Sequence, residues 1–423
     1  MRTAAPLSVP WNGTLMSPVP ISYPSRKYRP AIRPDQVPTG HPAQARFDLS
    51  VQIPVRLLTT LGEELHRQKG NLVANGTMAA LRKSRPAPGL ELDTMSAVPG
   101  IGPRDVLVAV RYAGICGTDH HIFDWDEWSA NRVPLGIVVG HEFTGTVAAV
   151  GEGVSQVTVG QRVSGEGHIG CGVCELCRTG RAHICERIDI IGIDRDGCFA
   201  EYVAMPDHNL WVLDERIPDL AAAIMDPLGN AMHAVSAAQV SGRNVLVTGS
   251  GVIGLASVAI AQSLGAARVI ATDVDPHRLE LARHFGADDV VLSSDPGWVA
   301  EVRGITAGEG PDVLIEMSGH PDALSGGFAA LRNGGTAALL GLPKSAVPLD
   351  LSNDIIFKGA TVLGINGRIV YDTWYAVERF LLSGQLDLDA LVTDVLPLEK
   401  FEKAFALIAS RTALKVIFEI GAR

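Results

Sequence analysis

The segment from residue 244 to residue 285 joins a Val/Leu-rich strand, a glycine turn and a helix, and it limits the possible fold more than any other part of the chain. The turn reads Gly249-Ser-Gly-Val-Ile-Gly254, and Asp273 ends the next expected strand, 22 residues after Gly251. Such glycines let backbone N–H groups approach a pyrophosphate at a helix N-terminus, where the helix dipole favours negative charge. The segment predicts a dinucleotide-binding unit that uses Gly249, Gly251, Gly254 and Asp273.

Strands and helices continue to alternate after this turn. We expect strands at 244–248, 268–272, 289–292, 312–316 and 336–340, with helices at 252–263 and 276–285 among those between them. This alternation predicts a parallel, doubly wound sheet. The charge-free stretch 244–267 is too polar and too interrupted by glycines for a membrane span, so no membrane partner is expected.

Asp273 also indicates which dinucleotide is bound. Its carboxylate is placed to accept hydrogen bonds from the adenosine ribose and would repel a 2′-phosphate, which favours NAD over NADP. Arg278 is the counterargument, because an arginine can hold that phosphate. Packing beside the adenine is the preferred interpretation of Arg278, and a solvated charge on the helix surface stays open.

Four cysteines with short spacing, Cys171, Cys174, Cys177 and Cys185, form a second strong pattern. Four thiolates that converge from one loop suit a closed, tetrahedral structural zinc site. An iron–sulfur cluster and a pair of disulfides are the alternatives, although nothing else in the sequence indicates an oxidising compartment. We therefore expect a cytoplasmic protein, with the remaining Cys198 a buried apolar residue.

A second metal site is predicted from Cys116, His141 and Glu142, which offer thiolate, imidazole and carboxylate ligands. Three protein ligands leave a position open for substrate, as in catalytic zinc sites. Glu142 could instead support its neighbour from outside the coordination sphere, and both His141 and Glu142 could be simple turn residues. Zinc beside a nicotinamide predicts oxidation of an alcohol, with hydride transfer to the cofactor.

Such a reaction must release a proton from a buried hydroxyl. We expect Thr118 to pass it, through a ribose hydroxyl of the cofactor, to His121, because histidine titrates near neutral pH and can relay a proton to water. A turn-forming role for Thr118 is the alternative. The adjacent His120 would point elsewhere and receives no role.

The remainder of the chain suggests an irregular, partly closed β domain, with strands at 106–111, 143–150, 161–164 and 199–205. The net charge of 36 − 46 = −10, without a basic stripe, makes nucleic acid an unexpected partner. Residues 1–77 differ, with 10 of the 25 prolines and nine Lys/Arg against four Asp/Glu. This extension is expected to be disordered, except for a helix-like stretch at 55–69, and to arise from a start assigned too far upstream, a targeting peptide or a true tail.

Further motifs carry a family resemblance that extends from Met78 to the C-terminus. They are Ala113-Gly-Ile-Cys-Gly-Thr-Asp-His-His-Ile-Phe-Asp-Trp-Asp-Glu-Trp128, Val139-Gly-His-Glu142, Gly165-Glu-Gly-His-Ile169, Asp226-Pro-Leu-Gly-Asn-Ala231, Glu316-Met-Ser-Gly319, Ile356-Phe-Lys-Gly359 and Thr373-Trp-Tyr375. With the metal and glycine patterns, they resemble the medium-chain zinc-dependent alcohol dehydrogenases, most closely the L-threonine 3-dehydrogenase branch. The resemblance implies NAD-dependent oxidation of L-threonine to 2-amino-3-oxobutanoate, two zinc ions per subunit, one catalytic and one structural, and a homotetramer.

The resemblance also implies roles for individual residues. Asp226 would lie beside the catalytic metal and support proton transfer or complete its coordination, and His168 would orient the substrate. Arg368 is a weaker candidate for the substrate carboxylate. The implied cofactor contacts are Ile253, Asp273, Arg278, Leu340, Gly341, Leu342, Ile365 and Asn366.

The implied fold is α/β, with a GroES-like irregular β catalytic domain, 78–228 and 366–423, around an inserted Rossmann domain, 229–365. The stretches 413–419 and 361–365 are the candidate contact surfaces between subunits. The metal residues do not separate a threonine dehydrogenase from a polyol or aminocyclitol dehydrogenase. A nucleotide-binding protein without catalytic activity would be expected to lack Cys116, His141 or the relay.

Overall fold

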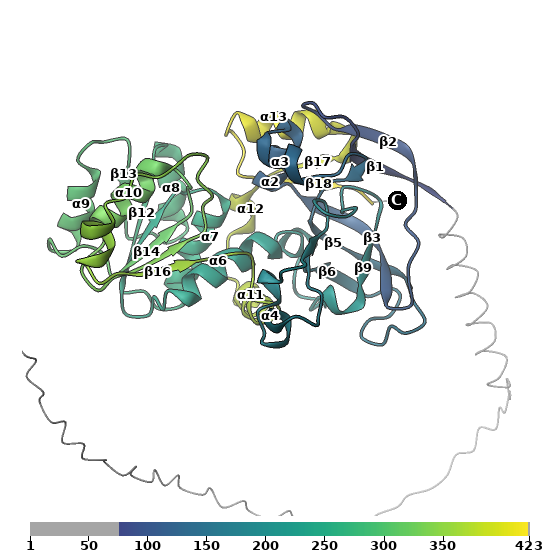
Figure 1. The fold of residues 1–423 in the computed structure, drawn as a ribbon, viewed down its shortest axis with the longest axis horizontal. Coiled ribbons are helices and arrows are strands. Elements are labelled where there is room, and N and C mark those ends of the chain that lie inside the picture. The colour runs from purple at the N-terminus through teal and green to yellow at the C-terminus, as the bar shows by residue number, and fades with distance from the viewer. Residues whose placement is uncertain (1–75, 422–423) are drawn as a thin grey trace, which may run out of the picture. The chain divides into compact units, whose positions relative to one another are not determined.

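The computed structural model describes residues 76–421 (Figure 1). The helix expected at 55–69 and almost all of the extension lie outside the described residues. Within residues 76–421, no helix is long and apolar enough to cross a membrane. The charge-free stretch 244–267 instead forms a strand, a turn and a helix, as predicted.

The first large element is a mixed seven-stranded sheet with the order β10-β6-β5-β3-β18-β17, in which β9 also pairs with β3. Its strands are β3 (Asp105–Gly114), β5 (Glu142–Val150), β6 (Arg162–Gly165), β9 (Tyr202–Pro206), β10 (Leu210–Val212), β17 (Val392–Pro397) and β18 (Lys415–Glu419). A three-stranded sheet in the order β2-β1-β4 contains β1 (Thr77–Lys83), β2 (Glu91–Ala97) and β4 (Ile137–Val138). The β domain expected from the sequence is confirmed.

The C-terminal strands complete this sheet rather than forming a surface of their own. β18 pairs antiparallel with β3 and parallel with β17, and its first four residues are buried. The expectation that the stretch 413–419 offers a contact surface between subunits is therefore wrong. The sequence shows an apolar strand there, but not that both of its edges are already paired.

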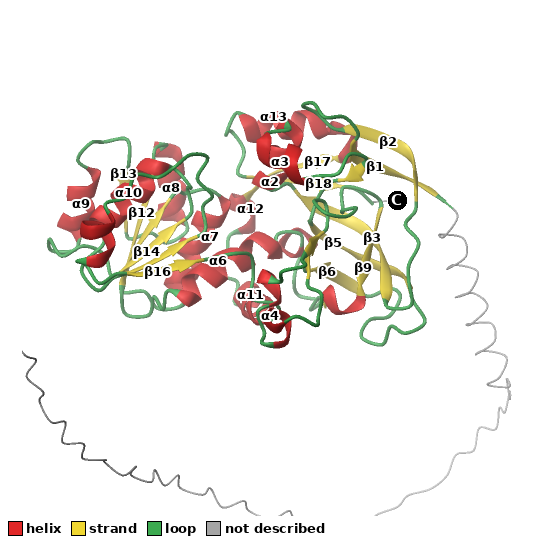
Figure 2. Cartoon of the chain, in the orientation of Figure 1, coloured by secondary structure: helices red, strands yellow, loops and turns green. Residues whose placement is uncertain are grey.

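The second large sheet is six-stranded and entirely parallel, in the order β13-β12-β11-β14-β15-β16. Its strands are β11 (Asn244–Thr248), β12 (Arg268–Asp273), β13 (Asp289–Leu292), β14 (Val313–Glu316), β15 (Thr336–Leu339) and β16 (Thr361–Gly364). The main helices near it are α6 (Met225–Ala237), α7 (Val252–Ser263), α8 (Pro276–His284), α9 (Trp298–Ile305) and α10 (Pro321–Ala330) (Figure 2). The predicted strands agree with these to within a residue or two at each end.

Both faces of this sheet are buried, which explains its nearly uniform apolar strands. Val245 and Val247 of β11 belong to a core with α6 and α7, whereas Leu246 between them packs in a separate core with α9 and α10. Successive residues of a strand point to opposite faces, so each face receives its own apolar layer. The doubly wound architecture follows from this pattern.

Shorter elements lie outside these sheets and carry much of the chemistry. They are α2 (Gly117–Asp124), α3 (Glu127–Arg132), β7 (His168–Ile169), α4 (Glu175–Arg178), η1 (Ala182–Ile184), β8 (Asp189–Ile190), η2 (Asp207–Asn209), α5 (Asp219–Ala222), η3 (Leu351–Ile356), α11 (Asp372–Leu382), α12 (Leu388–Leu391), η4 (Leu398–Lys400) and α13 (Phe401–Ala409). Two of them, β7 and β8, pair with each other.

Candidate active site and metal centres

Strand pairing brings together the three residues predicted for an open metal site. β3 pairs with β5 so that Gly114 lies opposite Glu142, and the chain then turns at Cys116 into α2. One potential ligand atom from each of Cys116, His141 and Glu142 lies within 4.8 Å of the others. His141 and Glu142 are buried and Cys116 is partly exposed. The cluster is thus open on the side of Cys116.

Buried polar atoms test whether a metal fits this cluster. Oε1 of Glu142 and Oδ2 of Asp226 are buried and have no hydrogen-bond partner among the described residues, whereas Oε2 of Glu142 contacts Lys415 and Nδ1 of His141 faces Asp119. Such atoms are costly unless something binds them. Burial alone would lower the pKa of His141, but the carboxylate of Asp119, 3.4 Å away, helps to raise it well above its usual value. Surroundings that favour a proton on His141 also favour a metal cation, so the residues fit zinc.

The carboxylate of Glu142 also has a cationic partner, Lys415. The buried ammonium of Lys415 forms an ion pair with Glu142 and donates a hydrogen bond to the carbonyl oxygen of Ile115 at 2.8 Å. A Cβ at Gly114 would collide with the Glu142 carboxylate and lie 3.0 Å from Cε of Lys415, so glycine is needed here. Burial raises the pKa of Glu142, and Lys415 opposes that rise.

Asp226 belongs to a second buried group of charges. Nη1 of Arg368 lies 2.6 Å from Oδ1 of Asp226, and Nε of Arg368 donates to Oε2 of Glu166 at 2.8 Å. Trp374 donates from its indole nitrogen to the same oxygen of Glu166, also at 2.8 Å. Gly229 leaves room for this arrangement, because a Cβ there would lie 2.6 Å from Cδ of Arg368.

His168 lies beside these charges, on β7. Its Nδ1 is 3.0 Å from Oε1 of Glu166 and 2.6 Å from Nη2 of Arg368. The structure therefore links His168 to Asp226 through Arg368. Every side-chain nitrogen of Arg368 already has a protein partner, and the side chain is only 2% exposed. The interpretation of Arg368 as a direct partner of a substrate carboxylate finds no support in this arrangement.

The two relay candidates lie on α2, directly after Cys116. The hydroxyl of Thr118 is 3.8 Å from the sulfur of Cys116. Thr118 and His121 are three residues apart in a helix and therefore face the same side. Nδ1 of His121 is 2.5 Å from Oδ2 of Asp126, a contact that we had not predicted.

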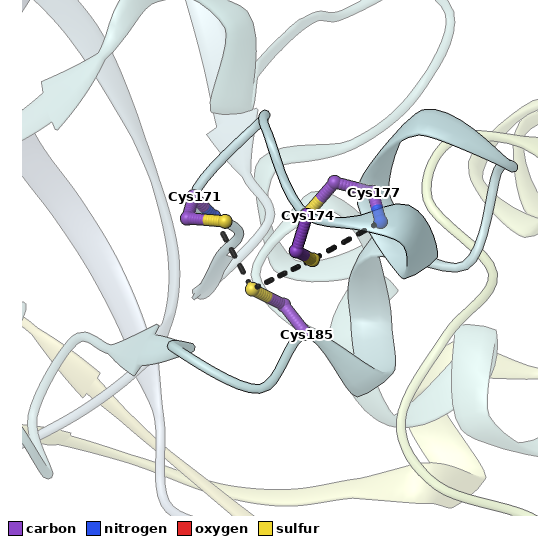
Figure 3. Close-up of side chains that lie close together, drawn as sticks. All are labelled: Cys171, Cys174, Cys177 and Cys185. Atoms are coloured by element: carbon purple, nitrogen blue, oxygen red, sulfur yellow. Dashed lines mark hydrogen bonds between the residues drawn. The ribbon is translucent and has the colours of Figure 1, made fainter.

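The four clustered cysteines converge as expected, with their sulfurs within 4.8 Å of one another (Figure 3). Cys174 caps the N-terminus of α4, and its sulfur accepts a hydrogen bond from the backbone of Cys177 at 3.4 Å. Backbone N–H groups, chiefly that of Val173, lower the pKa of Cys171 to about 6. The guanidinium of Arg187 also donates to the sulfur of Cys171, at 3.3 Å.

These contacts stabilise thiolates, the form that binds a metal. All six cysteines of the described chain are free thiols, so the disulfide alternative is wrong. Cys198 is fully buried, as expected, and burial raises its pKa well above the usual value.

Each of the three glycines in the predicted dinucleotide turn is favoured at its position for a different geometric reason. Gly249 has a φ of +86°, which favours glycine, and a Cβ at Gly254 would collide with the carbonyl oxygen of Gly249. Gly251 precedes the first turn of α7, and a Cβ there would meet nothing within 4 Å. The helix N-terminus is therefore open for the close approach of a ligand.

Asp273 ends β12 beside this turn. Its carboxylate accepts hydrogen bonds from the backbone N–H groups of Ser250, at 2.7 Å, and Asp275, at 3.0 Å. Arg278 instead donates to the carbonyl oxygens of Arg411 and Ala413, at 3.1 and 2.9 Å, and burial lowers its pKa. The interpretation of Arg278 as a solvated surface charge is wrong, because its guanidinium joins the second sheet's domain to the segment before β18.

The other cofactor candidates occupy the same edge of the parallel sheet. Leu340, Gly341 and Leu342 follow β15, Ile365 and Asn366 follow β16, and Ile253 is in the first turn of α7. The carboxyl ends of parallel strands share one edge, where open α/β sheets bind ligands. Leu342 is 87% exposed, and a Cβ at Gly341 would collide with the backbone of Gly319.

Comparison with known proteins agrees with this geometry. A family model described as "Alcohol dehydrogenase GroES-like domain" matches residues 102–215, and one described as "Zinc-binding dehydrogenase" matches residues 252–383. The chain belongs to the zinc-dependent alcohol dehydrogenases. The predicted family, and with it the GroES-like and Rossmann architecture, is confirmed.

Individual members of this dehydrogenase family match most of the chain. The L-threonine 3-dehydrogenase of Symbiobacterium thermophilum is 46% identical over 342 residues, which are 81% of this chain and 97% of that protein. The Bacillus subtilis enzyme of the same name is 45% identical over 343 residues, 81% of this chain and 99% of that protein. The crystal structure of 2R,3R-butanediol dehydrogenase from Bacillus subtilis has a TM-score of 0.74 at 27% identity and covers 81% and 99% of the two chains.

Four charged residues of this zinc-dependent dehydrogenase were missed from the sequence: Asp119, Asp126, Glu166 and Lys415. Glu166 and Asp126 lie inside motifs that were recognised, Gly-Glu-Gly-His and Trp-Asp-Glu-Trp, so their positions beside His168 and His121 gave some signal. Lys415 gave none, because its partner Glu142 is far away in the sequence.

Proposed function

We propose that this protein is an L-threonine 3-dehydrogenase, which oxidises the secondary hydroxyl of L-threonine to the ketone of 2-amino-3-oxobutanoate with NAD⁺. The observation that carries the proposal is the 46% identity to an L-threonine 3-dehydrogenase over nearly its whole length. The convergence of Cys116, His141 and Glu142 supports the same chemistry.

Cys116, His141 and Glu142 would hold the catalytic zinc, and Cys171, Cys174, Cys177 and Cys185 the structural zinc. The turn from Gly249 to Gly254, together with Asp273, would hold NAD. When bound there, zinc would polarise the substrate hydroxyl and NAD⁺ would accept the hydride. Two ligand sets of this kind fit one open and one closed site.

The residues around the open site prepare it for this reaction. Asp119 orients His141 from behind, as carboxylates commonly do for metal-binding histidines. Asp226 is buried in the first turn of α6, where Arg368 fixes one of its oxygens and leaves Oδ2 without a partner among the described residues. We assign Asp226 to proton transfer or to completion of the coordination sphere.

Proton release belongs to Thr118 and His121. The hydroxyl of Thr118 can pass the substrate proton toward His121, whose side chain is 38% exposed and can deliver it to water. His168, held by Glu166 and Arg368, is placed to orient L-threonine. The buried charges of Glu166, Arg368 and Asp226 keep these groups in fixed positions.

Asp273 supports the choice of NAD, because a 2′-phosphate would lie against its carboxylate. Nη2 of Arg278 is already bonded to the carbonyl oxygens of Arg411 and Ala413, which holds the guanidinium against the segment before β18. We also propose a homotetramer that uses the edge strand β16, where Val362 is 41% exposed. Free thiols suit a cytoplasmic location. We propose that residues 78–228 and 366–423 form the catalytic domain and that residues 229–365 form the cofactor domain.

A substrate panel tests the proposal against a polyol or aminocyclitol dehydrogenase, which would use the same metal residues. NADH formation is followed by absorbance with L-threonine, sorbitol, 2,3-butanediol and an aminocyclitol at equal concentration. A strong preference for L-threonine is expected. Turnover of the polyols without turnover of L-threonine would overturn the substrate assignment and leave the chemistry in place.

A further inference from the structure

The relay candidate His121 has a carboxylate partner. Its Nδ1 lies 2.5 Å from Oδ2 of Asp126, and the two side chains are 38% and 36% exposed. The ring of Trp128 meets the imidazole edge-on, with 6.3 Å between ring centroids. The imidazole is therefore held on two sides and still reaches solvent.

Asp126 is itself fixed from the opposite side. It caps the N-terminus of α3, and its Oδ1 accepts hydrogen bonds from the backbone N–H and the hydroxyl of Ser129, both at 3.0 Å. Burial would raise the pKa of Asp126, but the backbone of Ser129 and then the contact with His121 lower it instead. The carboxylate is thus charged near neutral pH, with one oxygen committed to Ser129 and the other to His121.

A fixed carboxylate decides which nitrogen of a histidine carries the hydrogen, because an ionised carboxylate only accepts hydrogen bonds. Nδ1 of His121 must then carry a hydrogen, and in the neutral imidazole Nε2 keeps its lone pair. This arrangement matches the one by which a buried aspartate fixes the tautomer of a catalytic histidine in serine proteases.

We propose that Asp126 is a positioning residue for the proton relay, which reserves Nε2 of His121 for the proton that leaves the substrate. This role rests on the proposed dehydrogenase function. The proton of the substrate hydroxyl passes by way of the Thr118 hydroxyl to Nε2, while the hydrogen on Nδ1 stays bonded to Asp126. Nε2 of the resulting imidazolium then releases its proton to water, and the neutral histidine is restored.

The chain offers a matched control on the same helix. Nδ1 of His120 lies 3.0 Å from Oδ2 of Asp124, one turn along α2. This pair has the same chemistry as His121 and Asp126, but adjacent residues of a helix point in different directions. Loss of the Asp124 carboxylate should therefore leave the relay unchanged.

Asp126→Asn is the decisive variant. Asparagine also caps helices well, so α3 should persist, but its amide can donate to Nδ1 and move the hydrogen of His121 to Nε2. We expect kcat for L-threonine oxidation to fall by about 100-fold or more, the scale of acid–base catalysis, with little change in KM. Asp124→Asn should keep the wild-type kcat.

The tautomer is measured directly from ¹⁵N spectra of histidine-labelled protein, with the His121 signals assigned from a His121→Gln variant. Wild-type protein should show His121 protonated on Nδ1, and Asp126→Asn should show it protonated on Nε2. Protonation of wild-type His121 on Nε2, or a wild-type kcat in Asp126→Asn, would overturn the proposal. Failure of wild-type protein to oxidise L-threonine would instead refute the proposed function, because the wild-type tautomer can be read without turnover.

Discussion

Nη1 of Arg368 lies 2.6 Å from Oδ1 of Asp226, and the two side chains are only 2% and 6% exposed. The same guanidinium forms a second ion pair with Glu166, which is 1% exposed. One cation is thus shared by two buried carboxylates. Arg368 contacts only Oδ1 of Asp226, and Oδ2 has no hydrogen-bond partner among the described residues.

Arg368→Met should destabilise the fold strongly. The substitution leaves Glu166 and Asp226 buried without a cation, and breaking a buried pair typically costs about 3–5 kcal/mol. The measurement is urea unfolding of the purified protein. Arg216→Met is the control, because Arg216 pairs with Asp214 at the surface and is 70% exposed. If Arg368→Met lowered the free energy of unfolding as little as the control does, the role assigned to Arg368 would be contradicted.

Glu166 should make the stability depend on pH. Burial would raise its pKa, but Arg368 outweighs burial and lowers the pKa well below the usual 4.5. A group with a lowered pKa contributes stability above its unfolded pKa and loses that contribution as the pH falls towards its folded pKa. The difference in unfolding free energy between wild type and Glu166→Gln should therefore be largest near neutral pH and should shrink below pH 4.5.

Urea unfolding at a series of pH values checks this dependence. Glu152→Gln changes an exposed glutamate and should show no such trend. A difference between wild type and Glu166→Gln that stays constant as the pH falls would contradict the ion pair with Arg368.

Cys185→Ser should remove the structural zinc. A closed site needs four ligands, and the sulfur of Cys185 accepts hydrogen bonds from the backbones of Cys171 and Arg187 at 3.4 and 3.3 Å. Zinc content, measured by mass spectrometry, is expected to fall from two ions per subunit to one. Cys198→Ser changes the cysteine outside both clusters and should keep both ions. Equal zinc content in wild type and Cys185→Ser would refute the four-cysteine site.

Asp273→Ala should weaken the preference for NAD⁺ over NADP⁺. Hydrogen bonds to a charged group contribute about 1.5–3 kcal/mol, so the KM for NAD⁺ should rise by about tenfold or more. The kcat/KM for NADP⁺ should rise, because the repulsion of its 2′-phosphate is removed. Asp322→Ala, at a side chain that is 93% exposed, is the control. An unchanged ratio of kcat/KM for the two cofactors would place the adenosine ribose elsewhere.

Local patterns in the sequence were sufficient for much of the fold and of the site. The strands and helices from 244 to 340 were predictable because apolar runs and glycine turns are read within a few residues. The four-cysteine cluster was predictable for the same reason, since its residues share one loop.

Contacts between distant segments were not predictable in this way. The ion pair of Lys415 with Glu142 and that of Arg368 with Glu166 depend on how β18 and the segment after β16 return to the first sheet. The same return places β18 between β3 and β17, which is why the stretch 413–419 was mistaken for a free surface. Arg278 was ambiguous because its partners are backbone carbonyl oxygens, which no side-chain pattern reveals.

NADH formation from L-threonine, measured for wild type beside a folded and structurally zinc-loaded Cys116→Ser variant, tests the central claim most directly. We predict clear NADH production by wild type and almost none by the variant, because serine replaces the thiolate of the open metal site. An inactive wild type, or a Cys116→Ser variant that oxidises L-threonine as well as wild type does, would contradict the account.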